Sequence, residues 1–150
     1  MNSEEFSIRD YQAGDRDGVV ALWREAFAGD PPRNEPNAVI DRKEHARDGL
    51  FFVGVLANRV VETVLAGFDG IRGWIYHLAV LPEFRRRGLA DRMMDHVEAE
   101  LRTRDCPKIN LQVRTSNGEV AAFYERRGYA IDQLISFGKT LGGDADSSVD

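Results

Sequence analysis

The 150-residue sequence is poor in cysteine and histidine and has no long apolar run. Its single cysteine, Cys106, cannot form an internal disulfide and has no partner at the spacing of metal-binding cysteine pairs. The three histidines are scattered, so no metal site is predicted. The first residues lack the basic start and apolar core of a signal peptide, and no stretch is apolar enough to span a bilayer. These absences predict a cytoplasmic protein with no metal and no membrane partner.

A surplus of basic residues is also missing. The chain has 20 Lys and Arg against 25 Asp and Glu, a formal net charge of −5. No global positive field attracts nucleic acid, so any anion site must be local. Residues 142–150, GGDADSSVD, have the composition of a disordered acidic tail. Residues 1–141 are then expected to form one domain of ordinary size.

The spacing of apolar residues predicts strands and helices in alternation. Helical patterns cover residues 15–28, 37–48, 88–104 and 118–127. Strand patterns cover residues 6–9, 50–56, 60–68, 74–81 and 108–114, and residues 129–140 are expected to add one or two strands. Antiparallel strands come first and a strand–helix–strand unit follows. We therefore expect an α/β fold with a central mixed, mostly antiparallel sheet and helices on both faces.

Three arginines stand before the helix predicted at residues 88–104. Arg85, Arg86 and Arg87 lie where free N–H groups already make a helix end positive, and no Ser, Thr, Asp or Asn caps it. A bound phosphate would neutralise the guanidinium groups and accept hydrogen bonds from the free amides, and Gly88 would let it approach the backbone. A solvated basic turn explains the charge run by itself equally well. The position between an apolar strand and an amphipathic helix favours the phosphate.

Two blocks of the sequence resemble the GNAT N-acetyltransferase superfamily. The first is residues 85–90, Arg-Arg-Arg-Gly-Leu-Ala, which follow the strand end at residues 78–81 and match the family pattern of Gln or Arg, two residues, Gly, one residue, and Gly or Ala. The second is Asn117, Ala121 and the run FYERRGY at residues 123–129. The resemblance covers residues 6–140 and extends to a bacterial subgroup whose acceptors are unassigned.

The resemblance implies a sheet whose two central parallel strands, residues 74–81 and 108–114, splay apart around the pantetheine arm of acetyl-coenzyme A, the co-substrate. Carried onto matching positions, it implies that coenzyme A is held by Leu78, Ala79, Val80, Arg85, Arg86, Arg87, Gly88, Leu89, Ala90 and Asn117. Asparagine is also a preferred helix N-cap, so a structural role for Asn117 stays open beside the cofactor role.

The activity implied by the resemblance is direct transfer of acetyl to a primary amine, carried by a small molecule or a peptide. Tyr124 then matches the family tyrosine that protonates the leaving thiolate, and a phenol can do so while staying neutral beforehand. The structural alternative is a core tyrosine. Segment 23–48 is where the family usually meets its acceptor, and its carboxylates are explained equally well as amine ligands or as a solvated face.

The general base stays open among Tyr76, His77, Glu62, Asp69 and a water molecule. In an unbroken strand Tyr76 shares a face with residues 78 and 80, and His77 points to the other face, whereas a bulge would change this. Because no base stands out, a non-catalytic acyl-coenzyme A sensor or interaction module is the second hypothesis. The oligomeric state is left open between monomer and homodimer.

Overall fold

The structure is a computed structural model that describes residues 5–142. The chain divides into two compact units between Asn110 and Leu111. In chain order the elements are β1 (Ser7–Asp10), η1 (Ala13–Asp15), α1 (Arg16–Ala26), η2 (Pro32–Asn34), α2 (Pro36–Ala46), β2 (Phe51–Leu56), β3 (Arg59–Phe68), β4 (Gly73–Val80), η3 (Pro82–Phe84), α3 (Leu89–Thr103), β5 (Ile109–Leu111) and α4 (Gly118–Arg126). No helix within residues 5–142 combines the length and apolar composition needed to cross a bilayer.

The sheet has the strand order β1-β2-β3-β4-β5. The first four strands pair antiparallel with their neighbours, and β5 runs parallel to β4. The predicted mixed sheet is therefore confirmed. β5 is shorter than predicted, with three residues, and the Gly73 amide donates to the Lys108 carbonyl at 2.8 Å at the beginning of β4.

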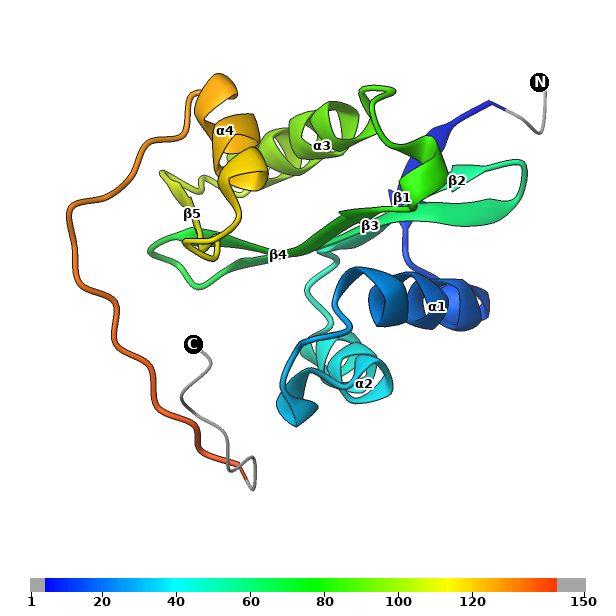
Figure 1. Ribbon diagram of the computed structural model, residues 1–150, viewed down its shortest axis with the longest axis horizontal. Coiled ribbons are helices and arrows are strands. Elements are labelled where there is room, and N and C mark those ends of the chain that lie inside the picture. Colours follow the sequence, from blue (N-terminus) through cyan, green and yellow to red (C-terminus); the bar gives the residue numbers. More distant parts are fainter. Residues whose placement is uncertain (1–4, 143–150) are drawn as a thin grey trace. The chain divides into compact units, whose positions relative to one another are not determined.

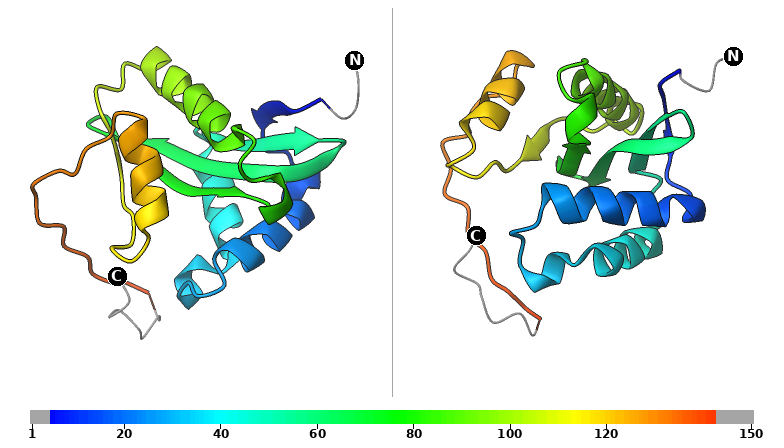
Figure 2. Two further views of the ribbon diagram at one scale, coloured as in Figure 1. Left: turned by 45° about the horizontal axis from the view of Figure 1, so that its top comes forward. Right: turned by 45° about the vertical axis from the view of Figure 1, so that its right-hand side comes forward.

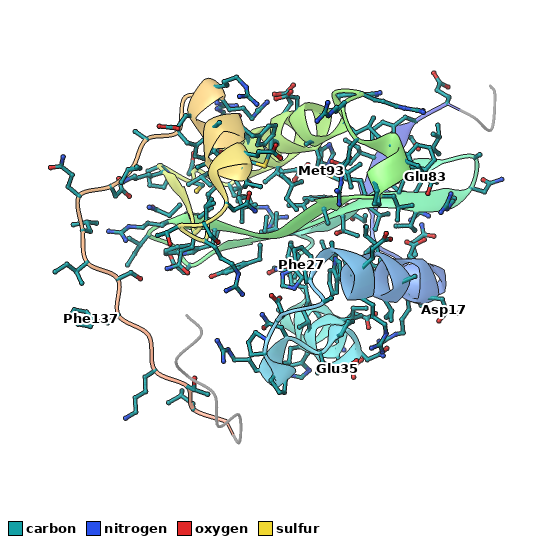
Figure 3. The ribbon with its side chains drawn as sticks, in the orientation of Figure 1. Asp17, Phe27, Glu35, Glu83, Met93 and Phe137 are labelled. Carbon is teal, nitrogen blue, oxygen red and sulfur yellow. The ribbon has the colours of Figure 1, made fainter. Side chains whose placement is uncertain are left out.

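Helices cover both faces of the sheet in the first unit, as the apolar patterns predicted (Figures 1 and 2). α1 and α2 lie on one face and α3 lies on the other. One core cluster of buried apolar residues joins α1, α2, the sheet and the start of α3: Val19, Leu22, Trp23, Ile40, Phe51, Val53, Val61, Leu65, Ala79, Leu81 and Leu89. α3 buries a stripe made of Leu89, Met93, Met94, Val97 and Leu101, and Met93 is marked in Figure 3. The two apolar faces together fix the position of β4, which carries the first predicted site residues.

The prediction of strands at residues 129–140 is wrong. These residues form neither strand nor helix, although their composition is rich in strand formers. Strand propensity measures how well a side chain fits a paired, half-buried surface, and it takes effect only where a partner edge is present. Phe137 is 92% exposed, so this segment has not found such a surface. Of the predicted tail at 142–150, residues 143–150 lie outside the described residues.

Glu62 is a buried carboxyl group in the middle of the sheet. It pairs across the strands with Val80 on β4 and Gly54 on β2, and its side chain is 0% exposed. Its neighbour Thr63 contacts α1, so Glu62 points to the α3 face. Within residues 5–142 neither carboxyl oxygen has a hydrogen-bond partner. Burial raises its pKa to about 9, against a smaller lowering by Arg92, so the group keeps its proton at neutral pH.

We expect this group to make folding stability depend on pH. Below the ordinary pKa of 4.5 the carboxyl is protonated in both the folded and the unfolded chain. Between that value and about 9 only the unfolded chain releases the proton, so the free energy of unfolding falls by up to about 1.4 kcal/mol per pH unit. Glu62→Gln removes this slope. Urea denaturation gives the free energy of unfolding at about pH 5 and at about pH 8. The loss of this free energy between the two pH values should be larger in the wild type than in the variant by up to about 4 kcal/mol.

The exposed Glu25 of α1 provides the matched control. Glu25→Gln should leave the pH dependence of the unfolding free energy as it is in the wild type. A Glu62→Gln protein with the wild-type slope would contradict the neutral buried carboxyl.

Candidate active site

The arginine-rich turn joins the end of β4 to the start of α3 through η3. Arg86 and Gly88 both have left-handed backbone, with φ of 63° and 76°. Gly88 is the N-cap of α3, and no side chain makes a cap hydrogen bond there. The three arginines and Gly88 are exposed, whereas Leu89 is buried and fixes the first helical residue in the core. The structure thus confirms an uncapped helix start behind three cations.

The arginine side chains brace this turn rather than cap it. Arg85 donates from Nε to the Val80 carbonyl at 3.0 Å, which ties the turn to the end of β4. The Arg87 guanidinium lies over the Phe84 ring, 5.3 Å from its centroid. A cation over an aromatic face is attracted by the ring but keeps its charge. Amides at the helix start and nearby positive charge are therefore both available to an anion.

A β-bulge interrupts β4 before the turn. Leu65 on β3 pairs with Tyr76, and Thr63 pairs with Ala79, so two residues of β4 stand opposite one of β3. The bulge includes His77, whose φ of 55° is left-handed. Cross-strand partners share a face, and Thr63 and Leu65 lie two residues apart, so Tyr76 and Ala79 face the same side.

This bulge settles the alternative that the strand pattern left open. Tyr76 does not share a face with Leu78 and Val80, as it would in an unbroken strand. The His77 ring lies on the α1 side, with its centroid 4.7 Å from those of Trp23 and Phe27.

A chain of two hydrogen bonds, the first buried and the second partly buried, holds the bulge in place. Trp23 of α1 donates from Nε1 to the Thr63 hydroxyl at 2.8 Å, and that hydroxyl donates to the His77 carbonyl at 3.0 Å. A left-handed conformation costs a non-glycine residue roughly 1–2 kcal/mol. Each hydrogen bond contributes about 1 kcal/mol net, so the pair offsets this cost. Sequence patterns did not predict this role, because Trp23 fits an ordinary core stripe. The polar Thr63 inside an apolar strand was the available signal.

His77 faces a cavity of about 350 Å³ between α1, η2 and the sheet. Its lining residues are Trp23, Arg24, Phe27, Ala28, Asp30, Pro31, Pro32, Asn34, Glu35, Pro36 and His77. Figure 3 marks Phe27 on the side of α1 that faces the sheet and Glu35 at the start of α2. Burial lowers the pKa of His77, and the Asp30 carboxylate opposes this with a smaller effect. The imidazole is therefore neutral at pH 7 and has a nitrogen lone pair.

The other three candidate bases lie elsewhere. Glu62 is sealed on the α3 face and protonated. Asp69 accepts hydrogen bonds from the amides of Ile71 and Arg72, both at 2.8 Å, and so stabilises the β3–β4 turn. Tyr76 is 52% exposed, and burial of the remainder raises its pKa. Of the four candidates, His77 alone lines the cavity.

Asn117 and Tyr124 belong to the second unit. Asn117 is the N-cap of α4, and its Oδ1 accepts from the Val120 amide at 3.3 Å, so the structural alternative for this residue is present. Tyr124 is buried in α4, with ring centroids 5.1 Å from Phe123 and 5.5 Å from Tyr129. Burial raises its pKa to about 12, against a smaller lowering by Arg127. The phenol is therefore neutral across the physiological range.

The fold together with the comparison with known proteins defines an α/β acyltransferase. The acetyltransferase (GNAT) family matches residues 17–129, so the chain belongs to that family. The predicted family and the predicted enzyme class are thereby confirmed.

Three solved structures illustrate the shared fold. Ard1 from Thermoplasma volcanium is 23% identical with a TM-score of 0.76, over 85% of this chain and 84% of that one. The aminoglycoside N-acetyltransferase AAC(6')-Iy, in complex with CoA, is 16% identical with a TM-score of 0.73, over 91% and 95%. Glucosamine-6-phosphate N-acetyltransferase from Arabidopsis thaliana is 20% identical with a TM-score of 0.67, over 93% and 100%.

Proposed function

We propose that the protein transfers an acetyl group from acetyl-coenzyme A to a primary amine in a ternary complex. The observation that carries this proposal is the uncapped start of α3 behind three exposed arginines. An anion there would accept hydrogen bonds from the amides of residues 88–90 and relieve the repulsion between the helix end and the cations. The pyrophosphate of coenzyme A supplies such an anion, and its pantetheine arm would extend along Leu78, Ala79 and Val80.

The acceptor amine would enter the cavity beside His77. Trp23 and Phe27 provide apolar walls, and the carboxylates of Asp30 and Glu35 favour a ligand that arrives as an ammonium ion. The names of two structural neighbours, an aminoglycoside and a glucosamine-6-phosphate N-acetyltransferase, describe amine acceptors. A primary amine on a small molecule or a peptide is the acceptor class that this supports.

An acceptor that arrives as an ammonium ion must first release one proton to solvent, because only the neutral amine has a free lone pair. The nitrogen of the neutral amine then forms a bond to the acetyl carbon while the carbon–sulfur bond breaks, so the nitrogen loses a further proton and the sulfur gains one. His77 is neutral and lines the cavity, which supports it as the proton acceptor. Tyr124 is protonated and matches the family position, which supports it as the donor to the thiolate. Asn117 would contact the cofactor arm with the part of its amide that does not cap α4.

The second candidate function is an acyl-coenzyme A sensor or interaction module without turnover. The arginine-rich turn at the start of α3 would also bind coenzyme A in such a sensor, because binding an anion needs neither His77 nor Tyr124. The two functions differ in whether free thiol appears when the protein is mixed with acetyl-coenzyme A and a panel of primary amines.

Gly88→Glu should weaken coenzyme A binding by at least about 100-fold in isothermal titration, because it places a carboxylate and a side chain at a left-handed helix start. Gly70 offers a matched control: it also has positive φ, at 91°, and an added side chain would meet open space at both sites. Gly70→Glu should bind coenzyme A as the wild type does. Equal affinity of Gly88→Glu and wild type for coenzyme A would contradict the proposal that the start of α3 binds its pyrophosphate.

Tyr124→Phe should lower kcat by a factor of about 10² to 10⁴, since the ring packing is kept and the proton is lost. Coenzyme A affinity should stay within a few-fold of wild type. The measurement is thiol release at saturating acetyl-coenzyme A. A variant with full kcat would rule out Tyr124 as the acid, and a wild type that binds coenzyme A but releases no thiol with any amine would favour the sensor.

His77→Gln should keep a hydrogen-bonding side chain but remove the titrating group. We expect kcat/KM to fall about 10² to 10⁴-fold and its acidic limb, which reports protonation of the base, to disappear from the pH profile. Because His77 has a lowered pKa, the wild-type limb should lie below the usual histidine value of 6.5. An unchanged pH profile in the variant would assign the limb to another group.

A further inference from the structure

Arg24 adds a positive charge to the wall of the cavity in which we place the acceptor amine. It lies on α1 and lines this cavity together with Asp30, Glu35 and His77. An acceptor that arrives as an ammonium ion is attracted by the two carboxylates but repelled by the guanidinium. A ligand whose only charge is positive therefore matches the carboxylates and not Arg24.

The contact that Arg24 makes with the protein is weak. Within the described part of the chain, its guanidinium has one polar partner, because Nη2 lies 3.5 Å from Glu35 Oε2. The two side chains are 59% and 42% exposed, and an exposed ion pair contributes little to stability. A guanidinium has five N–H donors, so Arg24 keeps donors for a ligand. It can therefore turn from Glu35 to an outside anion at little cost.

Glu35 does not depend on Arg24 for compensation of its charge. It caps α2 by accepting hydrogen bonds from the amides of Asn37 and Ala38 at 3.1 and 3.0 Å. These bonds lower the pKa of the carboxyl group, so it stays ionised at the positive end of the helix when Arg24 leaves. Arg24 is thus available to a ligand without loss of the α2 cap.

We infer that the acceptor is a small molecule that carries an anionic group, a carboxylate or a phosphate, besides its primary amine, and that Arg24 binds this group. The inference rests on the proposed transfer to an amine bound in the same cavity. A guanidinium is planar and can donate two parallel hydrogen bonds to the oxygens of either anion. The Asp30 carboxylate lies near enough to His77 to affect its pKa, so the ammonium end of the ligand has a charge partner of its own beside that histidine.

The volume of the cavity limits the distance between the two charged groups of the ligand. A sphere of about 350 Å³ is about 9 Å across, at the lower end of the range for ligand pockets. Four bonds of about 1.5 Å in an extended chain span about 5 Å. An amine and an anion that far apart both fit. Trp23 and Phe27 give the carbon atoms between them apolar walls.

Three amines of matched length test the acceptor class. γ-Aminobutyrate, butylamine and putrescine each have a primary amine at one end of a carbon chain, and their other ends are negative, neutral and positive. We expect kcat/KM for γ-aminobutyrate, measured as thiol release, to exceed that for butylamine at least about 10-fold, the effect of hydrogen bonds to a charged group. Putrescine should be the poorest of the three. Aminopropylphosphonate has the same spacing as γ-aminobutyrate and tests the phosphate type of anion.

A preference for either anionic amine over butylamine supports the inference and identifies the anion. Equal or lower kcat/KM for both anionic amines overturns it, and so does a preference for putrescine, which would indicate an acceptor with two positive charges.

Arg24→Gln should bring the ratio of kcat/KM for γ-aminobutyrate to that for butylamine close to one. Arg16 gives the matched control, because it also lies on α1 and joins α2 by donating to Asp41 at 2.7 Å and to Glu44 at 3.0 Å, outside the cavity lining. Arg16→Gln should keep the wild-type ratio. A ratio that survives in Arg24→Gln contradicts the inference. Loss of the ratio in both variants also contradicts it, because the preference would then report the packing of α1 on α2.

Binding without turnover separates this inference from the proposed transfer. The chain has two tryptophans, and Trp23 lines the cavity. Titration of each amine in the presence of coenzyme A, followed by the indole N–H resonance of Trp23, gives a dissociation constant whether or not acetyl is transferred. Tighter binding of γ-aminobutyrate than of butylamine, by about 10-fold but without thiol release, would contradict the transfer and support the anion site. Thiol release with equal affinities and equal kcat/KM for the two amines would support the transfer and contradict the anion site.

Discussion

The hydrogen bonds from Trp23 to Thr63 and on to the His77 carbonyl are the constraint on which the site depends. They connect α1, β3 and β4 at the one point where β4 leaves regular strand geometry. Without them, His77 would have no compensation for its left-handed backbone, and the two strands would regain a register without a bulge. The His77 ring would then lose its place against Trp23 and Phe27.

The start of α3 differs from those of α2 and α4 because no side chain caps it. Glu35 caps α2 by accepting from the amides of Asn37 and Ala38, and Asn117 caps α4. α3 has Gly88 as its N-cap, with no side-chain cap hydrogen bond and with three arginines before it. α1 also begins without a side-chain cap hydrogen bond, but of the four α-helices among residues 5–142 only α3 has three arginines directly before its N-cap. Unfavourable local electrostatics of this kind are found where binding offsets them.

The sequence predicted features that depend on neighbouring residues better than features that depend on distant parts of the chain. The helix of residues 89–103 followed from its apolar stripe, and its uncapped start behind three arginines followed from the residues next to Gly88, because both depend on neighbours within a few residues. The strands expected at 129–140 and the full length of β5 depend on a distant edge, which propensity does not contain. The side of the sheet that His77 faces depended on a bulge held by Trp23, forty residues from Thr63 in sequence. The family motifs identified the family and the enzyme class but not this geometry.

Burial favours the neutral form of both Glu62 and His77, and the two neutral groups have opposite chemical capacities. On the α3 face it raises the pKa of Glu62 to about 9, so the neutral carboxyl holds a proton and cannot accept one. On the α1 face it lowers the pKa of His77, so the neutral imidazole offers a lone pair. Burial therefore takes the ability to accept a proton away from the carboxyl group, because the neutral carboxyl already carries the proton. The same burial keeps that ability in the imidazole, because the neutral imidazole has a free lone pair. Because the cavity lies on the side of His77, the group that lines it is the one of these two that can accept a proton.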